Sequence, residues 1–260
     1  MSELFTLIEE TPPAGGQAGL GWLPDLPDFR DYTEEHPTIQ PLLEATGATT
    51  PPPALADSMD LRPWCSPIEN QGNIGSCTAH AGVGLIEYFE RRAFGRHLDA
   101  SRLFLYKATR NFLRWTGDTG AYLRSTIGAM ALFGVPPEEY WPYNTADFDK
   151  EPPAFCYAFA QSFQALTYYR LDPPGTDRAK LLKDIKTKLS ASLPSMFGFT
   201  VYSSISQAAT NGEIPFPSTG EKILGGHAVD VVGYDDAKVI KHTGSGAQTK
   251  GALLIRNSWG

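Results

Sequence analysis

A cysteine at the end of a glycine-rich loop is the residue of this 260-residue sequence whose setting most favours chemistry. The loop runs Gln71-Gly72-Asn73-Ile74-Gly75-Ser76-Cys77, and a helical pattern starts at the cysteine. Glycines let a ligand approach the backbone closely. The free amides and the positive dipole end of a helix favour the thiolate, the nucleophilic form. Two interpretations follow from the loop: a reactive nucleophile at Cys77, or a buried cysteine that acts as a small hydrophobe.

His227 is the histidine best placed to serve such a thiol as a base. Gly225 and Gly226 precede it and a strand-like run, 228–234, follows it, so its ring would stand at the edge of a strand. Asn257 ends the next strand-like run, and its side-chain carbonyl could hold the ring in one tautomer. Trp259 could shield that hydrogen bond from water. A surface or core position is expected for the others, His36, His80, His97 and His242.

Three blocks, in this order, resemble the signature motifs of the papain-like cysteine proteases. The blocks are Gln71 to Cys77, Gly226 to Tyr234 and Asn257-Ser258-Trp259-Gly260. His227 and Asn257 lie 150 and 180 residues after Cys77, at or somewhat beyond the roughly 130 to 150 typical of the family. The resemblance covers residues 57–260, and it implies a bacterial member of the family.

The resemblance implies a role for each residue that matches a family motif. Cys77 resembles the nucleophile, His227 the acid and base, and Asn257 the residue that orients the histidine. Gln71 resembles the side-chain donor of the oxyanion hole, with the backbone amide of Cys77 as the second donor. Trp259 is the supporting aromatic residue.

The stretch from Gly117 to Tyr122 resembles the glycine pair with which the family binds the substrate backbone as an added strand. Gly120 is the best match, and an ordinary turn before a helix is the alternative. Substrate contacts are expected at Gly120, Ala121, Tyr122, Gly226 and Ala228.

The sequence also departs from the family pattern. Ile74 stands where the family usually has a disulfide-forming cysteine, so that disulfide is expected to be absent, and Thr78 replaces the usual aromatic residue after the nucleophile. Gly226 replaces an aspartate often found before the histidine, which leaves the pH dependence of the pair open. Further strands follow the last block in the family, so a sequence that ends at Gly260 is expected to be truncated.

The elements that must position these residues are helices first and strands later. Apolar spacing predicts helices over 77–94, 101–112 and 122–133, and a fourth capped by Thr176 or Asp177. Strand-like runs cover 196–202, 228–234 and 252–255, and 237–250 is expected to be a long, mobile, solvated hairpin loop. This order favours a segregated α+β architecture. The resemblance implies a two-lobed papain-like fold: a helical lobe from Asp57 to Tyr168, a β-rich lobe after it, and an active-site cleft between them.

Composition argues against several other classes of protein. With 42% hydrophobic and 20% charged residues and no apolar run near 18, a globular chain that does not cross a membrane is expected. The net charge of −7 gives no basic field for nucleic acid. Cys65 and Cys156 are expected to be core thiols, and no spacing suits a metal, so no cofactor is expected. We expect a monomer. Met1 to Glu10 lacks the features of a secretory signal, which favours a cytoplasmic location or signal-independent export.

Residues 1–56 have the composition of a linker, with Pro12, Pro13 and the run Pro51 to Pro53. They are too short for the family's larger pro-regions and lack their helical motif. Gly21 to Tyr32, however, is apolar, aromatic and proline-rich, as suits an extended segment on another surface. We expect this pro-like or regulatory segment to pack in the substrate cleft, tethered by a flexible stretch of about 25 residues. A disordered tail is the alternative.

These features predict a cysteine peptidase that hydrolyses peptide bonds of protein or peptide substrates through a thioester acyl-enzyme. One alternative is an acyl or amide transferase with the same Cys77–His227 pair, and another is a non-catalytic peptide-binding module. Asn257 disfavours the first, because transglutaminases typically orient the histidine with an aspartate. The presence of Cys77, His227 and Gln71 disfavours the second.

Overall fold

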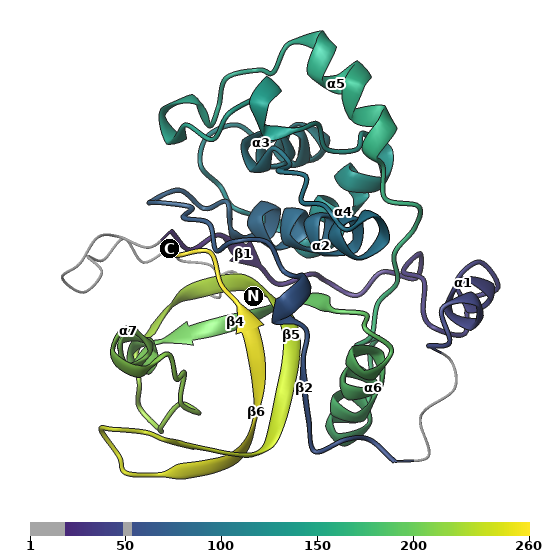
Figure 1. The fold of residues 1–260 in the computed structure, drawn as a ribbon. Helices are drawn as coiled ribbons and strands as arrows, with labels where there is room; N and C mark the ends of the chain where they lie inside the picture. The colour runs from purple at the N-terminus through teal and green to yellow at the C-terminus, as the bar shows by residue number, and fades with distance from the viewer. Residues whose placement is uncertain (1–18, 49–53) are drawn as a thin grey trace.

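The computed structural model describes residues 19–48 and 54–260, which form two lobes (Figure 1). The first lobe is helical, with α2 (Cys77–Phe94), α3 (Arg102–Leu113), α4 (Leu123–Leu132) and α5 (Ala154–Ala160). The second holds β2 (Ser58–Asp60), β4 (Ser195–Tyr202), β5 (Ile223–Lys241) and β6 (Gln248–Arg256), with α6 (Arg178–Ser190) and α7 (Ala208–Asn211). Short 3-10 turns cover Arg62–Trp64, Glu138–Tyr140, Thr145–Asp147, Gln161–Phe163 and Ser203–Gln207. The α+β fold predicted from the sequence is confirmed.

The predicted helices form, and their ends follow local chemistry. Gly95 ends α2 with a φ of +70°, a left-handed conformation that glycine adopts without a steric penalty. The hydroxyl of Ser101 caps α3 by accepting a hydrogen bond of 3.2 Å from a backbone N–H of its first turn. The carboxylate of Asp177 caps α6 in the same way, with two bonds of 3.0 Å.

The sheet of the second lobe is built around the long strand β5. This strand pairs antiparallel with β2, β4 and β6, and it carries His227 opposite Phe199 of β4. Because β2 pairs with β5 through Met59 and Tyr234, its residues belong to the sheet, although the sequence prediction had assigned them to the helical lobe. Among the described residues, no helix is long and apolar enough to span a bilayer.

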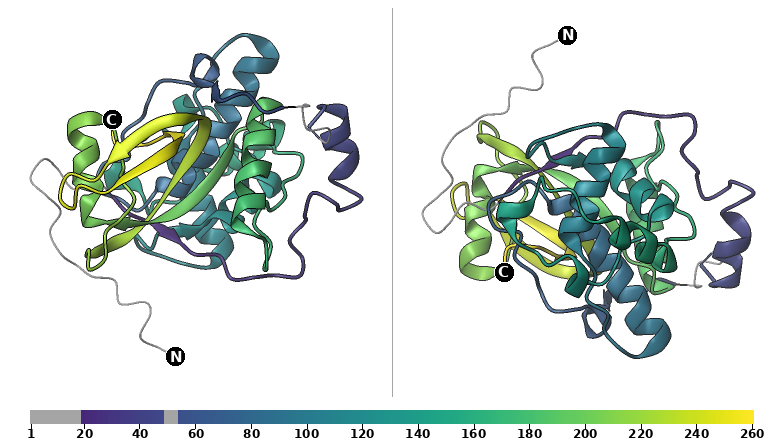
Figure 2. Two further views of the ribbon diagram at one scale, coloured as in Figure 1. Left: turned by 90° about the horizontal axis from the view of Figure 1, so that it is seen from below. Right: turned by 90° about the horizontal axis from the view of Figure 1, so that it is seen from above.

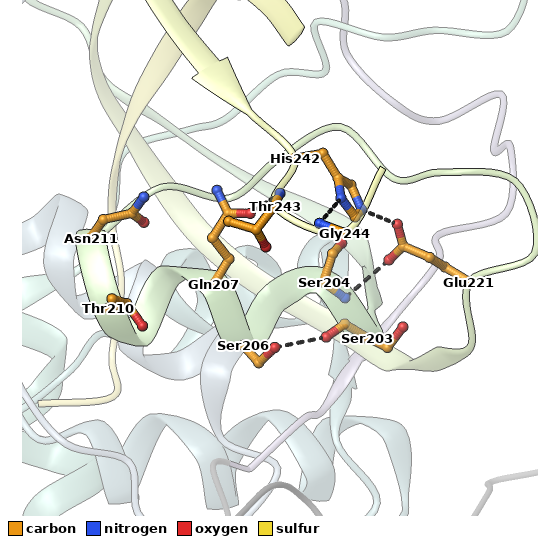
Figure 3. A pocket seen from close by; sticks show the side chains of 10 residues that line it. All are labelled: Ser203, Ser204, Ser206, Gln207, Thr210, Asn211, Glu221, His242, Thr243 and Gly244. Atoms are coloured by element: carbon orange, nitrogen blue, oxygen red, sulfur yellow. Dashed lines mark hydrogen bonds and ion pairs between the residues drawn. The ribbon is translucent and has the colours of Figure 1, made fainter. Parts of the chain in front are cut away.

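The hairpin between β5 and β6 differs from the loop predicted over 237–250. The two strands extend to Lys241 and from Gln248, so the turn covers only 242–247. At its base, His242 is buried, and its Nε2 lies 2.6 Å from Glu221 Oε1 while its Nδ1 accepts a 3.0 Å hydrogen bond from the Gly244 backbone (Figure 3). The prediction of a long loop is therefore wrong, because backbone pairing and this histidine order the segment.

Residues 19–48, called the N-terminal segment below, lie against both lobes (Figures 1 and 2). The short strand β1 (Trp22–Leu23) pairs in parallel with β3 (Ala121–Tyr122), between the helical lobe and the sheet. Farther along, the helix α1 (Gln40–Ala45) lies beside α6. This arrangement agrees with the expected docking of Gly21 to Tyr32.

The stretch after Tyr32 is docked as well, which corrects the prediction of a flexible tether there. Lys188 of α6 binds Glu34 through a 2.6 Å ion pair and the Ala48 carbonyl at 2.9 Å. An apolar cluster completes this interface. In it, Ile39, Leu43 and Ala48 of the N-terminal segment pack against Tyr169, Ala191 and Leu193. The prediction is wrong for residues 33–48, whereas Pro12, Pro13 and Pro51 to Pro53 lie outside the described residues.

All three cysteines are free thiols. Cys156 is buried against Phe104 and Ala108, and Cys65 lies half-buried at the edge of the cluster between α2 and the sheet. The sequence prediction of core thiols is confirmed for Cys156, while Cys65 packs at the core's rim.

Candidate active site

Cys77 is the first residue of α2 and is fully buried. Its side chain packs with Ala81 and Ala228, which brings the helix start against β5 of the other lobe. Burial raises the pKa of the Cys77 thiol to about 11, and backbone N–H groups of Ala228, Gly21 and Thr78 only partly oppose this. The thiol is therefore protonated at neutral pH while it stays covered.

His227 lies on β5 with its two ring nitrogens in different settings. Nε2 lies 2.7 Å from Oδ1 of Asn257, an oxygen that also accepts a 2.8 Å hydrogen bond from the Ser258 backbone. An amide oxygen only accepts, so Nε2 carries the proton and Nδ1 keeps its lone pair. Nδ1 is buried and has no hydrogen-bond partner. The ring thus presents a free base on the side away from Asn257.

The indole of Trp259 covers the imidazole of His227. The two rings stack with centroids 4.3 Å apart and planes 25° from parallel, which protects the hydrogen bond to Asn257 from water. Burial lowers the pKa of His227 to about 4, and the bond with Asn257 opposes the shift. Burial therefore favours a neutral imidazole at His227 and a neutral thiol at Cys77, not an ion pair, in this covered form.

Gln71 is fully buried, and its amide is held at both ends. Nε2 donates 2.9 Å hydrogen bonds to the carbonyls of Gly19 and Ile74, and Oε1 accepts a 2.6 Å bond from the Ser258 hydroxyl. Ser258 thereby fixes which way the amide donors point. Sequence reasoning missed this role, although the residue stands in the last of the three motif blocks.

A second group of side chains holds the loop between Gln71 and Cys77. The hydroxyl of Tyr143 donates a 2.9 Å hydrogen bond to the Gln71 carbonyl and lies 2.7 Å from the Ser76 hydroxyl. Asp118 accepts a 2.8 Å bond from the Gly75 backbone. These contacts fix the loop from the side of the helical lobe. Neither Tyr143 nor Asp118 was predicted to contribute to the site.

The N-terminal segment crosses the site directly. The Gly21 N–H donates to the Gly226 carbonyl at 3.1 Å, and the Ala121 N–H donates to the Gly21 carbonyl at 2.8 Å. A Cβ added at Gly19 or Gly21 would overlap backbone atoms of the loop before Cys77. Glycine at both positions is what lets the backbone pass this close.

The residues expected to bind substrate surround this crossing. Gly120 has a φ of +69°, and a Cβ there would overlap Gly21, so the position suits glycine on both counts. Tyr122 pairs with Leu23 across β1 and β3, and Ala228 is buried next to Cys77. The structure brings the predicted residues of both lobes together around one stretch of extended chain.

Arg124, at the start of α4, binds the next part of the N-terminal segment. Its guanidinium contacts both carboxylate oxygens of Asp31 at 2.6 Å and the Leu26 carbonyl at 2.7 Å, and it lies 3.5 Å from Asp25. Arg170 adds a 3.3 Å ion pair with Asp31. The exposed fraction of these side chains lies between 12% and 26%.

Two further features lie apart from this site. A hollow of about 460 Å³ (Figure 3) is lined by residues of 203–211 and 242–244 with Glu221, and none of the predicted site residues lines it. Glu87, His97 and Asp99 could together approach one metal ion. However, Arg102 already binds Glu87 and Asp99, at 2.9 Å each. A metal would have to compete with that guanidinium.

Comparison with known proteins places the chain in a family. Residues 55–260 match the papain family of cysteine proteases. The chain is 30% identical to an uncharacterized peptidase C1-like protein, L477, of Acanthamoeba polyphaga mimivirus, over 92% of this chain and 76% of that protein. It is 27% identical to mouse cathepsin K over 79% of this chain, which spans 56% of the cathepsin.

A solved structure extends the likeness to three dimensions. Xylellain, a cysteine protease from Xylella fastidiosa, is 29% identical and superposes with a TM-score of 0.71, covering 96% of this chain and 88% of that one. The two-lobed architecture is thus that of a known protease. The chain belongs to the papain family of cysteine proteases and is a cysteine peptidase.

Proposed function

We propose that Cys77 is the nucleophile of this peptidase, with His227 as acid and base, Asn257 as the residue that orients it, and Gln71 in the oxyanion hole. The observation that carries the proposal is the state of His227. Asn257 holds its Nε2, and Nδ1 is left as an unpartnered base in a buried site. Residues 57–260 would form the catalytic domain, and residues 1–56 a regulatory segment.

In the proposed reaction, Cys77 Sγ forms a bond to the carbonyl carbon of the peptide, after its proton has passed to His227 Nδ1. The carbonyl oxygen becomes an oxyanion that accepts hydrogen bonds from Gln71 Nε2 and the Cys77 backbone N–H. As the C–N bond breaks, His227 gives its proton to the amine. His227 then removes a proton from water, and the water oxygen bonds to the thioester carbon. The C–S bond breaks, the acid is released, and His227 returns its proton to Cys77 Sγ.

Cys77→Ala tests the nucleophile. The change removes one sulfur atom, so the melting temperature should change little while hydrolysis of a fluorogenic peptide falls to background. The matched control is Cys156→Ala, which removes a buried thiol remote from the motif blocks. If Cys77→Ala kept more than about 1% of the activity, a different nucleophile would have to act. Product analysis with an added amine separates hydrolysis from transfer to the amine.

We also propose that the N-terminal segment restrains the enzyme by occupying the substrate site. Its Gly19 carbonyl takes up the amide donor of Gln71, and Gly21 takes up the edge groups of Ala121 and Gly226. A protein or peptide substrate in extended form would need these same donors and acceptors. The segment and the substrate therefore exclude one another.

Deletion of residues 1–23 tests this restraint while leaving the contacts of Asp25 and Asp31 in place. The shortened enzyme should have a higher kcat/KM on a small peptide. Gly21→Ala should act in the same direction, because its Cβ would overlap Gly75. Phe29→Ala, in a residue that is 98% exposed, is the control and should change nothing. Equal efficiency of the full and shortened chains would disprove the restraint without touching the role of Cys77.

A further inference from the structure

Asp118 links two loops of the candidate site through a single oxygen atom. Its Oδ1 accepts a 2.8 Å hydrogen bond from the N–H of Gly75, two residues before Cys77, and another from the hydroxyl of Tyr106 in α3. The Tyr106 hydroxyl in turn accepts a 3.1 Å bond from the Gly120 N–H. Gly75 and Gly120 are thus joined by one bridge of three hydrogen bonds.

The chemistry of Tyr106 fixes the direction of each bond in this bridge. Tyr106 is fully buried, and burial, together with the charge of the Asp118 carboxylate, raises the pKa of its phenol. The hydroxyl therefore keeps its proton at neutral pH and donates it to the carboxylate. The oxygen of the hydroxyl is left to accept from the Gly120 N–H.

The two loops that the bridge joins lie backbone to backbone. A Cβ added at Gly75 would lie 3.2 Å from the backbone nitrogen of Gly120 and 3.3 Å from its Cα, closer than such atoms normally pack. Glycine at both positions allows this approach. Neither residue has a side chain that could interlock with the other loop, so hydrogen bonds must set the relative position of the two backbones.

Residues 118–121, called the substrate edge below, lose one anchor when the N-terminal segment leaves. In the covered form, the Ala121 N–H donates to the Gly21 carbonyl at 2.8 Å. Apart from bonds to the segment, the hydrogen bonds that tie the substrate edge to other elements in the described part of the chain run through Asp118 and Tyr106. The bridge therefore matters most in the open form, which is the form that can bind a substrate.

We propose that Asp118 is a positioning residue, which holds the substrate edge in register with the loop that ends at Cys77. In this role it aligns the scissile bond of a protein or peptide substrate with the sulfur, and it acts through Tyr106 and two backbone amides without contact to the substrate. The inference rests on the proposed function, in which Cys77 attacks a substrate whose backbone binds Ala121. A misplacement of about 1 Å between a nucleophile and its bound substrate can cost about 100-fold in rate.

The loop that ends at Cys77 has anchors of its own, so the loss of Asp118 should displace the substrate edge above all. The Gln71 side chain is held by the Ser258 hydroxyl, and the Gln71 carbonyl accepts a bond from Tyr143. Both contacts persist without Asp118. The nucleophile and the oxyanion donors should therefore stay in place, while a substrate bound to the edge moves relative to them.

Two 4-nitrophenyl esters with the same final residue separate these effects on the full chain. One is the ester of an acetylated tripeptide, whose backbone can bind the substrate edge. The other is the ester of a single amino acid with a free amine. Its only carbonyl is the one that is attacked, so none is left to accept from Ala121. The N-terminal segment lowers both kcat/KM values by one common factor, which cancels in the tripeptide-to-single ratio.

Asp118→Ala should lower the tripeptide-to-single ratio by about tenfold or more, through the tripeptide ester alone. Asp118→Asn should keep the ratio within about threefold of the wild type, because an amide oxygen can accept the same two bonds. Tyr106→Phe keeps the ring but removes the bridging hydroxyl, so it should lower the ratio as Asp118→Ala does. The matched control is Asp184→Ala, which removes a carboxylate that pairs with Lys180 on α6 and should leave the ratio unchanged.

Residue 118 is exposed, so Asp118→Ala opens no cavity in the core. If this variant nevertheless fails to fold, the ratio of Tyr106→Phe decides. An unchanged ratio in Asp118→Ala, or an equal fall for both esters, would show that the bridge does not position the substrate. A ratio in Asp118→Asn as low as in Asp118→Ala would also overturn the inference, because the charge and not the hydrogen bonds would then matter.

Failure of the proposed function gives a different result. If cleavage of both esters requires Cys77 but the ratio does not respond to Asp118→Ala, the inference about Asp118 is wrong and the proposed function stands. Enzymatic cleavage of the tripeptide ester that survives in Cys77→Ala overturns the proposed function, and the inference with it.

Discussion

Arg124→Ala should release the N-terminal segment without touching the proposed catalytic residues. The arginine belongs to α4, and its two shortest contacts are the paired 2.6 Å hydrogen bonds to Asp31. Arg170 stays within 3.3 Å of Asp31, so the carboxylate keeps one cation. The change thus weakens the docking of the segment at Asp31, and it also removes the 3.5 Å ion-pair partner of Asp25.

The size of the effect follows from the geometry. A hydrogen bond to a charged group contributes about 1.5–3 kcal/mol, while fully exposed ion pairs contribute about 0–1 kcal/mol. With one-quarter of Arg124 and 12% of Asp31 exposed, we take about 2 kcal/mol for the two bonds together. Because 1.4 kcal/mol changes an equilibrium constant tenfold, a loss of about 2 kcal/mol lowers the ratio of covered to open enzyme about 30-fold. The kcat/KM should rise by up to this factor, with the value of the enzyme lacking residues 1–23 as its ceiling.

The assay is hydrolysis of a small fluorogenic peptide, with each preparation normalised by active-site titration. Arg30→Ala is the control, because Arg30 lies in the same segment, forms its ion pair with Asp28 of that segment and is 76% exposed. Asp31→Asn and the double variant with Arg124→Ala complete a double-mutant cycle, which isolates the interaction free energy between Arg124 and Asp31. If Arg124→Ala stays within twofold of Arg30→Ala while the deletion activates strongly, the acidic part of the segment does not hold it in place.

Two more outcomes are expected. Ser258→Ala frees the Gln71 amide to rotate, so kcat should fall about tenfold with little change in KM. An unchanged kcat would show that Ser258 does not position the oxyanion donor. With its pKa raised to about 11, the covered Cys77 thiol is almost entirely protonated at pH 7, so iodoacetamide should react through the open form. In the proposed mechanism, opening lets the proton of Cys77 pass to His227, so no proton is taken from solvent. The alkylation profiles of the full chain and the chain lacking residues 1–23 should therefore run parallel from pH 5 to 9, and a full-chain rate that climbs tenfold per pH unit would mean direct attack on the covered thiol.

Features with a local signature could be predicted from the sequence. The start of α2 at Cys77 and its end at Gly95 follow from a loop, an apolar spacing and a terminal glycine, all within one stretch of chain. The same holds for the cap at Asp177. The motif blocks supplied the residues that the fold brings together around Gly21.

Features set by distant packing left no such signature. Tyr143 reaches the Gln71 carbonyl across 72 residues of sequence, and Lys188 reaches Glu34 across 154. The sequence over 237–250 predicted a loop, because the strands of this hairpin are exposed on both faces. A ribbon without a buried face shows no alternation of apolar and polar residues, which is the signal that identifies a strand.

The elements that carry the proposed catalytic residues and the N-terminal segment are held in place by different kinds of electrostatic contact. Arg256, next to Asn257, is buried, and it binds the Ser66 hydroxyl at 2.7 Å and lies 4.0 Å from the buried Asp230. Ser66 in turn donates to Glu87 of α2, the helix that begins at Cys77.

Removing one member of such a buried cluster leaves an uncompensated charge, at a cost of about 3–5 kcal/mol. Asp31 and Arg124, in contrast, keep some contact with solvent, and water can replace part of what is lost when they separate. The elements that carry Cys77, His227 and Asn257 can therefore stay in register while the N-terminal segment leaves, which a reversible restraint on this peptidase requires.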